Sequence, residues 1–167
     1  MTNPFRRCLI TFAFLSAAVL AGPAAAADVV LPAGMAELAR AADDAWNRRD
    51  AAAMVAFYAG DATSTIGKTE LRGKAELLDY FTGSFRNLPP GLTHRTVVRR
   101  LERIGELVAT DNAVYIEAPD GAQGKRVLRE FFTFSLLRPT AGGWEFVAVR
   151  ATPLTPPAPA VTPATSR

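Results

Sequence analysis

The side chains that could transfer a proton are few, and most lie in the second half of the chain. Tyr115 and Glu117 are two residues apart in an expected strand, so they share one of its faces. A carboxylic acid beside a phenol in apolar surroundings suits proton transfer. The alternation also allows the opposite arrangement, in which Val114 and Ile116 face inward and the other pair lies at the surface.

His94 is the only histidine, on a strand expected to begin at Thr93. A lone strand histidine is more often a surface or satisfied core residue, so it is a weak catalytic candidate beside Glu117 and Tyr115. With one histidine, and Cys8 as the only cysteine, the chain lacks the usual ligands of a catalytic zinc site. We therefore expect no metal and no cofactor.

A second pattern suggests a binding surface. Phe131, Thr133 and Ser135 alternate along an expected strand, so they share one face. One aromatic ring with two hydroxyls suits the wall of a ligand pocket, where a few polar groups orient a mostly apolar molecule. A dimer interface is the alternative interpretation for either face of this strand.

Three helices are expected to come first. Apolar residues at three- and four-residue spacing predict an amphipathic helix through Met35, Leu38, Ala42 and Trp46. Asp50 suits the N-cap of a second helix, which we expect to carry Met54, Phe57 and Tyr58 and to stop at a left-handed Gly60. A third helix follows Gly73, with a buried stripe of Leu77, Leu78, Phe81 and Phe85.

Strands dominate the rest of the chain. The β-branched segment 63–66 predicts a short strand, and the segment 93–108 predicts one long strand or a bent pair. Further strands are expected over 113–118, 126–138 and 144–151. We interpret Gly105 as a bulge and Asp111-Asn112 as a turn. Helices followed by strands indicate an α+β domain, with helices on one face of an antiparallel sheet.

Several residues occur together in an order that resembles a known family. They are Trp46, Asn47, Arg49-Asp50, Tyr58-Ala59-x-Asp61-Ala62-Thr63, Gly73-Lys74 and Gly142-Gly143-Trp144. The region from Met35 to Ala151 is similar to the SnoaL-like and ketosteroid-isomerase-like branch of the nuclear transport factor 2-like superfamily. The resemblance implies a cone-shaped curved antiparallel sheet with three N-terminal helices, enclosing an apolar pocket, and frequent dimers through the sheet.

The resemblance also implies where steroid-isomerase chemistry would lie. In those enzymes the oxyanion tyrosine precedes the Asp that matches Asp50 by two turns, and the base is an Asp three residues past the Thr that matches Thr63. These places hold Ala42 and Ile66 here, and neither side chain transfers a proton. The steroid-isomerase mechanism is therefore disfavoured, and whether the protein is an enzyme stays open.

The ends of the chain differ in composition from the domain between them. Arg6 and Arg7 precede an uncharged apolar run of 14 residues (9–22) and then small residues, which predicts a signal peptide over 1–27. The run is too short to span a membrane. Five prolines among Ala, Thr and Ser predict a disordered tail over 152–167, leaving a domain over 28–151. We expect a periplasmic or secreted protein with no membrane association after cleavage.

The charge excludes one class of partner. Without Arg6 and Arg7 the 19 basic residues become 17, against 16 acidic residues, so the mature chain carries a net charge of +1. Nucleic-acid binding requires an extended basic field, so we expect no such partner. Cys8 is lost with the signal peptide, and the mature chain has no disulfide.

Three functional hypotheses follow. The first is an exported protein that binds a small apolar molecule, as a homodimer, through Trp46, Tyr58, Thr65, Tyr115, Phe131, Thr133 and Ser135. The second is an isomerase, cyclase or hydratase acting next to a carbonyl of a cyclic or polyketide-like compound. The third is a non-catalytic dimerisation or assembly module, with the cone filled by Phe131 or Trp46.

Overall fold

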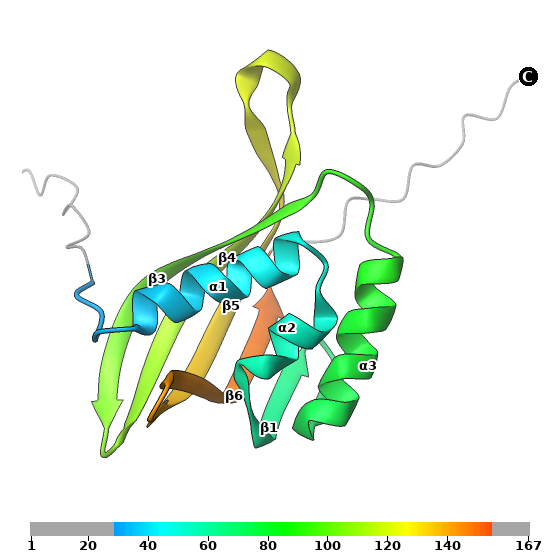
Figure 1. Cartoon of the computed structure of the whole chain (residues 1–167). Helices are drawn as coiled ribbons and strands as arrows, with labels where there is room; N and C mark the ends of the chain where they lie inside the picture. The colour runs from blue at the N-terminus through cyan, green and yellow to red at the C-terminus, as the bar shows by residue number, and fades with distance from the viewer. Residues whose placement is uncertain (1–28, 155–167) are drawn as a thin grey trace, which may run out of the picture.

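The computed structural model describes residues 29–154 (Figure 1). The predicted signal peptide and all but the first three residues of the predicted tail lie outside the described residues. Six strands form one curved sheet in the order β2-β1-β6-β5-β4-β3, and the helices cover one of its faces. The predicted α+β cone is confirmed.

Two helices open the domain. α1 (Met35–Asn47) buries Met35, Leu38 and Ala42 as predicted, and also Ala45, whereas Trp46 is only partly buried. Arg49, at a positive φ of 58°, makes the tight turn into α2 (Ala51–Ala56). Asp50 caps α2 as predicted, because its Oδ1 accepts the Ala53 N–H at 2.9 Å. The Arg49 guanidinium donates to the carbonyl oxygens of Leu88 (2.9 Å) and Pro89 (2.7 Å), which holds the loop after the third helix.

The second helix is shorter than predicted. It ends at Ala56, and Tyr58 already begins β1 (Tyr58–Ile66), so Gly60 lies within a strand and not at a helix terminus. The cause is a long-range pairing: the Phe146 N–H donates to the Phe57 carbonyl at 2.9 Å, and β1 then runs parallel to the last strand. Each other neighbouring pair of strands in this sheet is antiparallel.

β2 (Thr69–Arg72), which the sequence did not predict, pairs with β1 and leads into α3 (Gly73–Arg86). α3 buries Leu77, Phe81 and Phe85 as predicted, whereas Leu78 is exposed. Its helical position places Leu78 beside the stripe and not on it. α3 packs against β1 and α2, and so closes one side of the cone.

Of the four remaining strands, the first is shorter than predicted and the other three are longer. They are β3 (Thr93–Ile104), β4 (Leu107–Pro119), β5 (Lys125–Thr140) and β6 (Gly143–Pro153), with a short 3₁₀ helix, η1 (Gly121–Gln123), before β5. Gly105, at a φ of +62°, makes the turn between β3 and β4, so the predicted bulge is wrong. The predicted turn at Asp111-Asn112 is also wrong, because both residues pair with β3 and β5. β6 extends to Pro153, two residues into the predicted tail.

The core has two parts. One packs α2 and α3 against β1 through residues such as Ala59 and Leu77, both completely buried. The other packs Met35 and Leu38 of α1 against Val108 and Leu137. Among the described residues, no helix has the length and apolar character that crossing a membrane requires.

Candidate ligand-binding site

A cavity of about 640 Å³ lies between α1, α3 and the concave face of the sheet. Aromatic and aliphatic side chains dominate its wall, among them Trp46, Phe81, Phe131 and Phe146. This volume is within the range of about 300–1,000 Å³ that is typical of small-molecule pockets. Trp46 and Phe131 line the cavity without filling it, so neither side chain plugs the cone.

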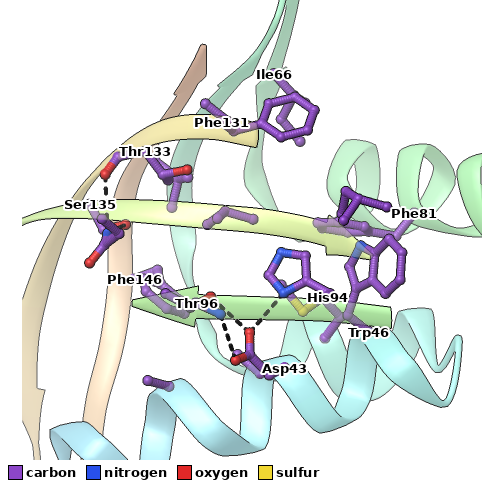
Figure 2. A pocket seen from close by; sticks show the side chains of 18 of the residues that line it. Asp43, Trp46, Ile66, Phe81, His94, Thr96, Phe131, Thr133, Ser135 and Phe146 are labelled. Atoms are coloured by element: carbon purple, nitrogen blue, oxygen red, sulfur yellow. Dashed lines mark hydrogen bonds and ion pairs between the residues drawn. The ribbon is translucent and has the colours of Figure 1, made fainter. Parts of the chain in front are cut away.

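The neighbouring strands β4 and β5 each present one face to the cavity. On β5, Phe131, Thr133 and Ser135 point inward, as the ligand-wall interpretation requires (Figure 2). On β4 it is Val114 and Ile116 that line the cavity. The sequence left open which pair faces inward. In the structure Val114 and Ile116 face the cavity, and Tyr115 and Glu117 lie on the opposite face of β4.

A polar cluster interrupts the apolar wall where β4 and β5 lie side by side. The Asn112 side-chain amide donates to the Thr133 carbonyl (3.1 Å) and to the hydroxyl oxygens of Thr110 (3.2 Å) and Ser135 (3.3 Å). Because a carbonyl only accepts, the amide nitrogen must face it, and this fixes the orientation of the amide. The amide oxygen and the hydroxyl hydrogens are then left to orient a ligand.

A second polar group lies where α1 crosses the edge strand β3. Asp43 Oδ1 is 2.7 Å from His94 Nδ1 and accepts the Thr96 hydroxyl at 2.7 Å, while Oδ2 accepts the Thr96 backbone N–H at 2.9 Å (Figure 2). His94 and Thr96 are two residues apart, so both present their side chains to the same face of β3. All three residues line the cavity.

The imidazole of His94 is held on two sides. The Trp46 ring packs against it with ring centroids 5.1 Å apart and an angle of 32° between the planes, and Trp46 in turn meets Phe85 edge-on at 5.7 Å. The His94 side chain is 14% exposed and that of Asp43 is 18% exposed. Figure 2 shows the second ring nitrogen of His94 directed away from Asp43 and toward the cavity.

Tyr58 lies deep in the cone, 3% exposed, with its ring against Phe81 and Phe146. Burial raises the pKa of its phenol well above the ordinary value, and the nearby Ser64 hydroxyl offsets only part of that rise. The phenol therefore stays neutral at any physiological pH. It lines the cavity as predicted, as an uncharged group.

Three of the predicted site residues do not line the cavity: Thr65, Tyr115 and Glu117. Glu117 Oε1 accepts from Arg95 Nε at 3.0 Å and Nη2 at 2.7 Å. The Tyr115 hydroxyl accepts from Arg99 at 2.8 Å, and the Arg95 guanidinium lies 4.5 Å from the centre of its ring. Tyr115 and Glu117 thus form a charged network with β3 and not a proton-transfer couple in the cone.

The two positions that replace the steroid-isomerase groups do face the cavity. Ala42 and Ile66 are both among the lining residues. The positions that match the oxyanion tyrosine and the base of the steroid isomerases therefore lie in the cavity wall. The side chains there have no transferable proton. Acid–base chemistry in this cone would depend on Asp43 and His94.

Sequence reasoning missed Asp43, Thr96, Thr110 and Asn112. Asp43 lies outside the apolar stripe that the spacing predicts for its helix, and Asn112 was assigned to a turn. One signal was present: Asp43 and Asn47 are four residues apart, so they share a helix face and can both dock on one strand. Within residues 29–154, no three His, Cys, Asp or Glu side chains gather closely enough to hold a metal ion.

Comparison with solved structures supports the fold. A ketosteroid isomerase-like protein from Erwinia carotovora atroseptica superposes with a TM-score of 0.58 at 21% identity, covering 74% of this chain and 96% of the other. A nuclear transport factor 2-like protein with a cystatin-like fold from Novosphingobium aromaticivorans gives 0.63 at 18%, covering 75% and 82%. A domain of unknown function from Nostoc punctiforme gives 0.62 at 17%, covering 72% and 75%. At these identities the likeness establishes the fold alone.

The chain has the cone-shaped fold of nuclear transport factor 2-like proteins. At the sequence level, the SnoaL-like domain family matches residues 39–101, from the middle of α1 to β3. The predicted resemblance to the SnoaL-like and ketosteroid-isomerase-like branch is thereby confirmed. No curated protein is similar enough in sequence to count as a match.

Proposed function

We propose that this protein binds a small, largely apolar molecule in its cone. The observation that carries the proposal is the cavity of about 640 Å³, with aromatic walls and two separate polar groups. Ligand pockets combine apolar surface with a few polar groups that fix the orientation of the ligand. Such a ligand carries an oxygen function at the Asn112 cluster and an apolar body against Trp46, Phe81 and Phe131.

The proposal is tested with the dye anilinonaphthalene sulfonate, whose fluorescence rises in an apolar site. We expect saturable binding of one dye per chain. Val98 and Val97 are adjacent on β3, and only Val98 lines the cavity. A Val98→Trp variant should therefore lose at least about tenfold in dye affinity because the new ring occupies the cavity, a loss of roughly 1.4 kcal/mol.

The matched control is Val97→Trp, which adds the same bulk to the other face of β3 and should leave dye affinity unchanged. Circular dichroism establishes that both variants are folded. Absence of dye binding by the wild-type protein, or equal affinity in the two variants, would contradict the proposal.

We also propose that the protein acts outside the cytoplasm, in the periplasm or the medium. The support is the sequence of residues 1–27, with its basic start, apolar run and small residues before Asp28. The intact mass of the protein from the native host should correspond to a chain that begins at Ala27 or Asp28. An intact mass that still includes residues 1–27 would exclude cleavage.

A homodimer is a further part of the proposal. Phe132, on the convex face of β5, is 42% exposed, and burying its ring against a second copy of the chain would stabilise a dimer. Sedimentation equilibrium should give twice the chain mass for the wild type and a monomer for Phe132→Glu. A wild-type monomer at micromolar concentration would show that the exposed ring serves no dimer.

The second candidate function is an isomerase, cyclase or hydratase acting beside a carbonyl group. The observation that favours it is the Asp43–His94 pair in the wall of the cavity. Imidazole is the side chain best suited to both accept and return a proton near neutral pH.

A further inference from the structure

Asp43 fixes which nitrogen of His94 carries the hydrogen. Its Oδ1 and Oδ2 accept from the Thr96 hydroxyl and the Thr96 backbone N–H, and a carboxylate offers acceptors only. His94 Nδ1, at 2.7 Å from Oδ1, must therefore be the protonated nitrogen. The lone pair of the neutral ring is then on Nε2, the nitrogen that Figure 2 shows directed toward the cavity.

This hydrogen bond is additional to the contacts that dock α1 on β3. Docking is achieved through the backbone: His94 N–H donates to Asn47 Oδ1 (2.7 Å), Asn47 Nδ2 donates to the His94 carbonyl (3.1 Å), and Thr96 N–H donates to Asp43 Oδ2 (2.9 Å). These bonds satisfy outward-facing backbone groups of an edge strand. These three hydrogen bonds do not involve the imidazole. Docking of α1 on β3 therefore does not explain why Asp43 also binds the His94 ring.

We propose that His94 is the proton acceptor of the cavity, that Asp43 is its positioning residue, and that the bound molecule is a weak acid of the phenol or enol class. The inference rests on the proposed ligand-binding function and specifies its ligand. The O–H bond of the ligand breaks, the proton moves to Nε2, and the electron pair stays on the ligand oxygen. The Asp43 carboxylate stabilises the imidazolium that results.

The surroundings favour a ligand that enters neutral. At the position beside His94, an oxygen already ionised in water would lose hydration and meet the like charge of the Asp43 carboxylate. A phenol or enol enters uncharged and ionises only when it meets His94. Arg129 also lines the cavity, and its positive charge favours the anion once it has formed.

Asp43 and His94 also line a second cleft, of about 260 Å³, on the other side of the pair. Its wall is polar: Arg40, Arg95 and Lys125 contribute three cations, and Asp43, Asp44 and Glu117 contribute three carboxylates. Opposite charges in equal number make this a hydrated cleft without preference for a charged ligand.

The first test is ¹⁵N NMR of the imidazole in the wild-type protein. His94 is the only histidine, so both imidazole ¹⁵N signals belong to it, and their couplings to the ring C–H protons distinguish Nδ1 from Nε2. The neutral ring should show a protonated Nδ1 and a bare Nε2. Protonation at Nε2 in the neutral ring would overturn the proposal, and this measurement needs no variant.

The second test uses 4-nitrophenol, whose anion absorbs visible light, at a pH where the free dye is mostly neutral. Binding to the wild type should at least double the anion fraction of the bound dye relative to the free dye. In Asp43→Asn the amide oxygen must still accept the Thr96 N–H, so the amide nitrogen faces His94 Nδ1 and donates to it. The lone pair moves to Nδ1, and the bound dye should stay neutral.

The control is Asp79→Asn, which removes an exposed carboxylate on α3 that lines neither the cavity nor the cleft. It should behave as the wild type. A dye bound in its neutral form by the wild type, or not bound at all, overturns the assignment of His94 and of the ligand class. The anilinonaphthalene sulfonate titration tests the ligand-binding function separately. If the cavity binds that dye but does not ionise 4-nitrophenol, the role of His94 is rejected and the ligand-binding function stands.

Discussion

Tyr58 shows how the cone controls the protonation of the side chains that it encloses. Its phenol is among the most buried polar side chains of the wall, and burial penalises the charged form. The folded protein therefore retains this proton at a pH where the unfolded chain releases it. The effect belongs to one residue and can be isolated by removing one hydroxyl.

Tyr58→Phe tests this effect. The raised pKa means that its contribution to stability is complete below pH 10.0, the ordinary value for tyrosine, and is lost as the pH rises above it. Above pH 10, the free energy of unfolding of the wild type should fall about 1.4 kcal/mol per pH unit more steeply than that of the variant. Urea titrations between pH 8 and 11 measure both slopes, and parallel curves would show that the Tyr58 phenol titrates normally.

The site residues differ in how well the sequence predicts them. Phe131, Thr133 and Ser135 follow from alternation on one strand, and the structure places all three in the cavity wall. Tyr115 does not line it, because alternation says which residues share a face and not which face is inside. Asp43 was missed because its partner His94 is 51 residues away and the contact exists only once α1 lies on β3.

At the scale of elements, the cone depends on the sharp connections that turn each helix toward the sheet. The α1–α2 connection uses Arg49 in a left-handed conformation and Asp50 as a cap. The β2–α3 connection uses Gly73 at a φ of +68°. Each can be weakened without touching the cavity wall.

Asp50→Ala removes the cap of α2. The Ala53 N–H then loses its acceptor at 2.9 Å, and we expect the free energy of unfolding to fall by about 1 kcal/mol. Asp50→Asn keeps an oxygen acceptor and should be nearly neutral. Urea denaturation compares the two; equal losses in both variants would mean that the charge and not the cap is responsible.

A pair of glycines on α3 gives a second test. At Gly73 a β-carbon would lie 3.2 Å from the Gly60 carbonyl oxygen, and the φ is positive, so Gly73→Ala should cost more than about 1 kcal/mol. Gly83 has helical geometry and open space around it, so Gly83→Ala should stabilise the protein by about 0.5–1 kcal/mol. Thermal unfolding should therefore shift in opposite directions, and shifts of the same sign would contradict this account of α3.

Local periodicity predicts most elements but not those that distant pairing creates. The stripe on α1 and the alternation on β5 predict both correctly, because one face of each is buried. Gly60 resembles a helix stop, yet β6 pairs with the segment that starts at Tyr58 and extends it into a strand. Asp111-Asn112 resembles a turn, but neighbouring strands on both sides satisfy the Asn112 backbone and side chain.

At the scale of the whole molecule, two separate core clusters hold the helices against the sheet and leave a space between them. The order along the chain, with helices first and strands after, predicts helices on one face of a sheet. The cone shape was implied by the family resemblance. The volume left inside it could not be predicted, because it depends on how far α1 and α3 lie from the sheet. That space, and not any single residue, is what the proposed function requires.

The most direct measurement is native mass spectrometry of the protein purified gently from its own host, with a denaturing run beside it. The native mass should exceed the polypeptide mass by that of a small molecule, which the denaturing run releases. The same sample should exchange this molecule for anilinonaphthalene sulfonate. A native mass equal to that of the polypeptide alone, both as purified and after incubation with the dye, would contradict a ligand-binding cone.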